Sequence, residues 1–85
     1  MLNQQQSPRV ELDSLAAFIA VVEAGSFAEA ARRLATDPSV ISRRVSRLEA
    51  RLGVRLFSRT TRRVALTEVG ERYRLRVAGL LDQLD

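Results

Sequence analysis

The chain has 85 residues and a formal net charge of +4, with 46% hydrophobic and 28% charged residues. This composition is typical of one small soluble domain and excludes a disordered chain, and no apolar run approaches the ~20 residues of a membrane-spanning helix. Cysteine and histidine are absent, which excludes disulfides and predicts no metal site, no cofactor and no enzyme, since the commonest general base is missing.

The positive charge is concentrated in the central third of the chain. Residues 37–67 hold eight arginines and two acidic residues, a net charge of +6, whereas residues 1–36 and residues 68–85 each carry −1. All 14 basic residues are arginine, whose guanidinium pairs bidentately with phosphate and with guanine. A basic segment of this kind predicts a polyanionic partner.

The first predicted element is a helix over residues 13–24, preceded by a flexible polar tail over residues 1–10. Apolar residues recur at helical spacing from Leu12 onward, which is the pattern of an amphipathic helix. Asp13 or Ser14 is suited to cap the start of this helix, and the glycine that follows Ala24 is suited to end it.

A second helix is expected over residues 26–35, and a third follows it almost at once. Ser26 and Glu29 form a capping-box pattern, in which Glu29 reaches back to Ser26. Asp37 is suited to cap the third helix with its side chain turned inward, and Pro38 is suited to the first helical position. Two helices separated by so few residues predict a helix-turn-helix.

The third helix, predicted over residues 37–52, has two contrasting faces. At 100° per residue its large apolar side chains form one narrow stripe, the expected core face. The opposite face alternates serines with arginines, and Glu49 lies between the two faces. The apolar stripe comprises Ile41, Val45, Leu48 and Leu52, and the opposite face comprises Ser39, Ser42, Arg43, Ser46 and Arg47.

A small hairpin, or wing, is predicted over residues 55–66. Two short stretches of partly alternating apolar and polar residues flank a polar turn, which is a hairpin pattern. Leu56, Val64 and Leu66 are expected to point inward. The arginines and threonines around the turn, available to solvent, are Arg55, Arg59, Thr60, Thr61, Arg62 and Arg63.

The last predicted element is a helix over residues 67–85, capped by Thr67. Its apolar residues follow steps of four, three and four, a spacing that resembles a coiled-coil seam and predicts a dimer interface. A second apolar flank adds to this seam. The expected interface residues are Tyr73, Val77, Leu80, Leu81 and Leu84.

The serine and arginine face of the third helix fits the major groove of duplex DNA. That groove admits one α-helix, and bases are read there through hydrogen-bond donors and acceptors. Short serines allow close approach, while Arg43 and Arg47 are long enough to reach bases or phosphates. The residues 59–63 at the wing tip are placed to contact the adjacent backbone or to enter a minor groove.

Two alternatives remain open from the residues alone. The first is a winged-helix module for protein interaction and dimerisation without specific DNA binding, in which the arginine face is simply solvated. The second is non-specific or RNA binding by the basic third, although Phe57 and Tyr73 are isolated aromatic residues and offer no stacking platform.

The sequence resembles the N-terminal winged helix-turn-helix domain of LysR-type transcriptional regulators. The matching motifs are L-x-x-F-x-x-V-x-E-A-G-S-F-x-x-A-A over residues 15–31, S-x-x-V-x-R-L-E-x-x-L-G-V-x-L-F-x-R over residues 42–59, and R-R-x-x-L-T-x-x-G over residues 62–70. This ordered set is far more specific than a helix-turn-helix alone.

The resemblance implies a mainly α fold with a winged helix-turn-helix domain over residues 11–66 and a linker helix over residues 67–85. It implies that Pro38, Ser39, Arg43 and Arg62 read bases. Phosphate contacts are then expected from Ser42, Ser46, Arg47, Arg59, Thr60, Thr61 and Arg63.

The resemblance also implies the partners and the location. Members of the family bind imperfect inverted repeats of double-stranded DNA as homodimers through the linker helix, or as tetramers when full-length. They act in the bacterial cytoplasm on the nucleoid, with no membrane partner. A small-molecule effector binds through a further domain, so we expect this chain to be a fragment that lacks it.

Overall fold

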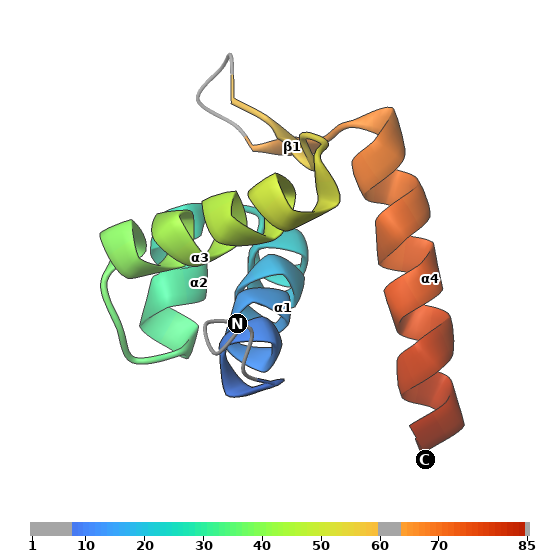
Figure 1. Cartoon of the computed structure of the whole chain (residues 1–85). Coiled ribbons are helices and arrows are strands. Elements are labelled where there is room, and N and C mark those ends of the chain that lie inside the picture. The colour runs from blue at the N-terminus through green and yellow to red at the C-terminus, as the bar shows by residue number, and fades with distance from the viewer. Residues whose placement is uncertain (1–7, 60–63, 85) are drawn as a thin grey trace, which may run out of the picture.

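The computed structural model describes residues 8–59 and 64–84, with side chains placed for residues 12–59 and 64–83. Three helices pack into one body, a two-stranded antiparallel hairpin extends from its edge, and a fourth helix stands beside it (Figure 1). This is the predicted winged helix-turn-helix followed by a C-terminal helix. The elements are α1 (Pro8–Ala24), α2 (Phe27–Arg33), α3 (Pro38–Leu52), β1 (Phe57–Ser58), β2 (Ala65–Leu66) and α4 (Glu68–Leu84).

Helix α1 begins earlier than predicted. Its first residue is Pro8, so residues 8–10 are helical and the prediction of a flexible tail up to residue 10 was wrong. Proline is favoured at the first helical position, where its missing N–H is not needed. The first turn is mostly polar, so the spacing of the apolar residues did not indicate that the helix begins there. Asp13 and Ser14 therefore lie inside the helix and do not cap it.

Helix α2 forms half of the predicted capping box. The Ser26 hydroxyl accepts a hydrogen bond from the Glu29 amide at 3.0 Å, as expected. The Glu29 carboxylate instead accepts hydrogen bonds from Arg32 and Arg33 along the same helix. The helix ends at Arg33, two residues earlier than predicted, because Ala35 adopts a left-handed conformation with φ of 56°.

Helix α3 begins and ends as predicted, but its cap differs. Asp37 has the extended backbone of an N-cap residue and Pro38 follows it in the first helical position. The Asp37 side chain is exposed and makes no capping hydrogen bond, so the prediction that it turns inward was wrong. At the other end Gly53, with φ of 72°, supplies the left-handed residue that stops the helix.

The core lies where α3 crosses α1 and α2. Ile41, Val45 and Leu48 are buried as predicted, against Phe18 and other buried residues of α1 and α2. Leu52 is 42% exposed, although it was assigned to the same stripe. It belongs to the last turn of the helix, and the chain turns away at Gly53 before anything covers it fully.

The wing is short and is held at its base. Its strands pair Phe57 with Leu66 and Ser58 with Ala65, and the Phe57 ring packs against Phe18, with centroids 5.4 Å apart. The Thr67 hydroxyl accepts a hydrogen bond from the Gly70 amide at 2.9 Å and donates one to the Arg55 carbonyl at 2.6 Å. Thr67 therefore caps α4, as predicted, and also ties it to the segment that enters the wing.

Helix α4 turns part of the predicted dimer seam towards its own chain. Tyr73 meets the Phe18 ring edge-on at 5.3 Å, and Val77 is only 5% exposed. Leu80 and Leu81 remain 57% and 43% exposed, and the side chain of Leu84 lies outside the described residues. The seam is therefore divided, because its first half covers the core of the same chain.

Candidate nucleic-acid interface

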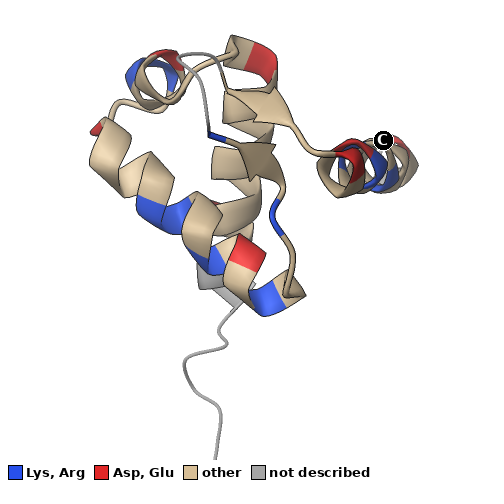
Figure 2. Cartoon of the chain, turned by 90° about the horizontal axis from the view of Figure 1, so that it is seen from above, with Lys and Arg blue, Asp and Glu red and all other residues tan. Residues whose placement is uncertain are grey.

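The outer face of α3 is exposed and basic. Ser39, Arg43, Ser46 and Arg47 are all exposed, and Ser42 is half-buried. Figure 2 shows basic residues spaced along this helix. Because the opposite stripe is buried against α1 and α2, the helix is a firm support for these side chains.

The two central arginines of this face are available to a partner. Within residues 12–59 and 64–83, neither Arg43 nor Arg47 takes part in an ion pair. Of the two carboxylates at this helix, Asp37 is exposed at the N-cap and Glu49 is 7% exposed. The cationic charge of the central turns is therefore not neutralised by side chains of the described chain.

Glu49 makes contacts that the sequence analysis did not predict. Its carboxylate accepts hydrogen bonds from the backbone amides of Leu56 at 2.7 Å and of Phe57 at 3.2 Å. It also lies 3.4 Å from the Arg59 guanidinium and 3.9 Å from that of Arg55. The only sequence signal was its position between the two faces of the helix, which does not reveal partners seven and eight residues away.

Arg59 has two partners within the chain. Its Nη2 donates a hydrogen bond to Oε1 of Glu49, and its guanidinium lies 5.0 Å from the centroid of the Phe27 ring. The side chain is 30% exposed, so part of it still faces solvent. Arg59 thereby links the wing to α2 and α3, a role that the sequence did not predict.

An apolar hollow of about 390 Å³ lies between the start of α3 and the wing. It brings together four residues that the sequence assigned to the site, all on one concave surface beside Phe27 and Val64: Pro38, Ser39, Ser42 and Arg59. The remaining assigned wing residues, Thr60, Thr61, Arg62 and Arg63, lie outside the described residues.

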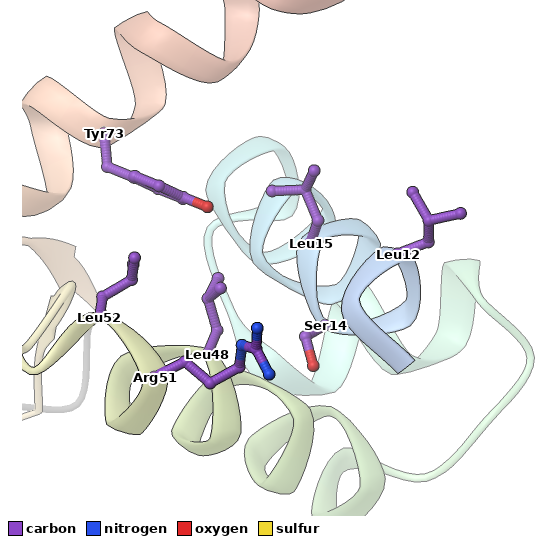
Figure 3. Close-up of a pocket in the computed structure, with 7 residues that line it drawn as sticks. All are labelled: Leu12, Ser14, Leu15, Leu48, Arg51, Leu52 and Tyr73. Atoms are coloured by element: carbon purple, nitrogen blue, oxygen red, sulfur yellow. The ribbon is translucent and has the colours of Figure 1, made fainter. Parts of the chain in front are cut away.

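A second hollow, of about 410 Å³, opens at the other end of α3 (Figure 3). It is lined by Leu12 and Leu15 of α1, by Tyr73 of α4 and by three residues near the end of α3, namely Leu48, Arg51 and Leu52. Ser14 also lines it, and its buried hydroxyl finds no hydrogen-bond partner in the described part of the chain. This hollow contains none of the predicted base or phosphate contacts.

The described residues contain no group of three or more acidic, histidine or cysteine side chains that could hold a metal ion. No single helix among them is long and apolar enough to cross a membrane. The bent pair of Leu12–Ala24 and Phe27–Arg33, at 116°, reaches that threshold by length and composition only.

Comparison with known proteins identifies consistent relatives. Residues 12–71 match the family model described as bacterial regulatory helix-turn-helix protein, lysR family. The HTH-type transcriptional regulator CrgA of Neisseria meningitidis is 47% identical over 72 residues, which are 85% of this chain and 24% of that protein. The chain thus spans about a quarter of the length of this curated relative.

Two solved structures of protein–DNA complexes are similar to the fold. The structure of a CbnR DBD–DNA complex has a TM-score of 0.77 and 39% identity, covering 85% of this chain and 83% of that one. The structure of a BenM DBD with catB site 1 DNA has a TM-score of 0.73 and 36% identity, covering 86% and 84%. Both likenesses therefore extend over most of this chain.

Proposed function

The chain belongs to the lysR family of bacterial regulatory helix-turn-helix proteins, and on that premise we propose that it binds a specific sequence of double-stranded DNA as a homodimer. In this proposal α3 enters the major groove and the wing, residues 55–66, lies beside it. Residues 11–66 form the DNA-binding domain and residues 67–85 the linker helix. The likeness of the chain to the DNA-bound structures of CbnR and BenM supports DNA as the partner.

One observation carries the proposal: Arg43 and Arg47 are exposed and form no ion pair within residues 12–59 and 64–83, and they lie on a helix that is buried on its other side. Contact of these two arginines with phosphate therefore breaks no ion pair within the described residues, which makes the contact more favourable. The opposite stripe of buried residues fixes the orientation of the helix. Arginines that are only solvated do not require a helix whose orientation is fixed in this way.

The roles of the individual side chains follow from their reach. Pro38, Ser39 and Arg43 lie in the first two turns of α3, the part of a recognition helix that enters the groove most deeply. We assign base reading to these residues and to Arg62. Phosphate contacts are assigned to Ser42, Ser46, Arg47, Arg59, Thr60, Thr61 and Arg63.

The homodimer is assigned to the outer part of α4. Leu80 and Leu81 are exposed leucines near the end of this helix, and burying them against a second copy removes apolar surface from water. Leu84 belongs to the same end of the helix. Tyr73 and Val77 lie earlier on the same face of the helix, where they pack against their own chain.

Selection of bound sequences from a pool of random duplexes tests the proposal. We expect an imperfect inverted repeat to be enriched, because two-fold symmetry in a protein dimer is mirrored in its DNA site. Enrichment of a single half-site would contradict the dimer but not base reading. Recovery of no preferred sequence would refute specific binding.

The alternative is a winged-helix module that associates with proteins and has no specific role on DNA. The exposed leucines of α4 favour it as a second candidate. It predicts that binding to any duplex becomes negligible at moderate salt, whereas a specific site retains affinity through its base contacts. A titration of the selected duplex at increasing salt separates the two.

In the whole protein we propose a transcription regulator of the bacterial cytoplasm, active at the nucleoid. A small-molecule effector would act through a domain outside this chain, and the full-length protein would form dimers or tetramers. The proposal includes no cofactor, no enzymatic activity and no membrane partner.

A further inference from the structure

We infer that Glu49 is a positioning residue for DNA binding, which fixes the wing against the recognition helix and orients Arg59 towards the DNA backbone. The inference rests on the proposed function and deepens it, because it concerns how the wing and α3 act as one surface. Glu49 itself is 7% exposed and would touch no nucleotide.

The first support is the set of backbone bonds that Glu49 accepts. The amides of Leu56 and Phe57 both donate to its Oε2 atom, at 2.7 and 3.2 Å. These two residues form the entry to the wing, and both side chains are buried. A hairpin of two-residue strands is marginal by itself, so its direction depends on anchors such as this carboxylate.

The second support is the pairing of Glu49 with Arg59. The Arg59 Nη2 atom lies 3.4 Å from Oε1 of Glu49, and the Phe27 ring lies under the guanidinium at 5.0 Å. An arginine carries five N–H donors in a planar fork, so this bond occupies only part of the group. The ion pair and the ring restrict its rotation, which lowers the entropic cost of contacting a phosphate.

The third support is the position of Arg59 on the surface. It lines the hollow at the start of α3 together with Ser39 and Ser42, two residues that are proposed to face DNA. The carboxylate thus lies behind a basic group that lies beside the recognition helix. An acidic residue placed so close to a DNA-binding face would otherwise only repel phosphate.

This last point gives an experiment in which two hypotheses predict opposite signs. Glu49→Gln removes one negative charge, so simple electrostatics predicts tighter binding to DNA. If Glu49 positions the wing and Arg59, the same change weakens binding, because glutamine cannot form the ion pair or accept as strongly from both amides. We expect a loss of about tenfold.

The matched control is Asp37→Asn, which removes a negative charge from the exposed N-cap of the same helix. It is expected to raise affinity by about twofold, since no contact is lost and phosphate repulsion falls. Glu23→Gln, at an exposed position of α1, is expected to change affinity little. Affinities are measured by fluorescence anisotropy with a random-sequence duplex at about 0.05 M salt, where non-specific binding is measurable.

The double variant Glu49→Gln with Arg59→Gln tests whether Glu49 acts through Arg59. The two groups share one contact. The loss of DNA-binding free energy in the double variant is therefore expected to be smaller than the sum of the losses in the two single variants. Equal or tighter DNA binding by Glu49→Gln would overturn the inference. Strictly additive losses would overturn the orienting of Arg59, and thermal melting of each variant separates these effects from unfolding.

Hydrogen exchange in the parent chain keeps the inference testable if Glu49→Gln does not fold. The amide hydrogens of Leu56 and Phe57 are expected to exchange at least about a hundredfold more slowly than they would in an unstructured chain. Exchange of these amides without protection would overturn the inference. This measurement needs no DNA. If the parent chain bound no duplex at all, the proposed function would fail while the anchoring of the wing could still be confirmed or rejected.

Discussion

The carbonyl group of Leu56 lies so close to Gly70 that a Cβ atom at residue 70 would come within 2.1 Å of its oxygen. The same oxygen accepts a hydrogen bond from the Thr67 amide at 2.9 Å. The first turn of α4 is therefore pressed against the segment that enters the wing. This close contact between α4 and the segment before β1 is possible because residue 70 has no side chain.

Gly70→Ala should destabilise the fold by about 1–3 kcal/mol, the usual cost of overpacking a close contact. Gly79, in the same helix, provides the matched control, since nothing lies within 4 Å of the position its Cβ would take. Gly79→Ala should stabilise the chain by about 0.5–1 kcal/mol through helix propensity. Urea denaturation measures both changes, and equal effects of the two substitutions would contradict the close contact.

Arg43→Ala and Arg47→Ala should weaken DNA binding in different ways. For Arg43 we expect a loss of about 1–3 kcal/mol on the selected site, with relaxed preference at one base position. For Arg47 we expect similar losses on specific and random duplexes, with the slope of log affinity against log salt reduced by about one. Anisotropy titrations at several salt concentrations distinguish them, and an equal loss on both duplexes for Arg43→Ala would contradict base reading.

Leu80→Arg should weaken the dimer. Leu80 is 57% exposed on α4, and a charge placed there would have to be buried without a partner in the proposed interface. Sedimentation velocity should show a shift towards monomer in the absence of DNA. Leu34→Arg puts the same charge on a leucine that is 40% exposed in the turn after α2, and it should sediment as the parent chain does. Unchanged sedimentation of Leu80→Arg would exclude this surface as the interface.

The free energy of unfolding should fall at acid pH, and part of this fall should come from Glu29. Its hydrogen bond with Arg32 holds the pKa of this carboxyl below its ordinary value of 4.5. A carboxyl whose pKa is lower in the folded state stabilises the fold above its unfolded pKa, and this contribution is lost as the pH falls through the lowered value. NMR titration should show the lowered pKa, and Arg32→Gln should raise it towards 4.5. An identical pKa in both proteins would contradict the assignment.

Local signals in the sequence predicted the order of the elements and most of their bounds. The stripe of Ile41, Val45 and Leu48 is buried as its spacing indicated, and Gly53 and Thr67 have the roles of helix stop and helix cap. These features depend on residues within one or two turns of each other. Periodicity and capping describe such short-range relationships, so the sequence alone was sufficient for them.

The tertiary structure decided what depends on contacts between elements. The burial of Glu49 depends on backbone amides that return to it only after the chain turns at Gly53, and no side-chain pattern records a backbone amide. Likewise, Tyr73 and Val77 match the spacing of a dimer seam, but the direction of α4 turns them towards Phe18. Helical spacing identifies which residues share a face, whereas the packing of the whole chain determines what that face meets.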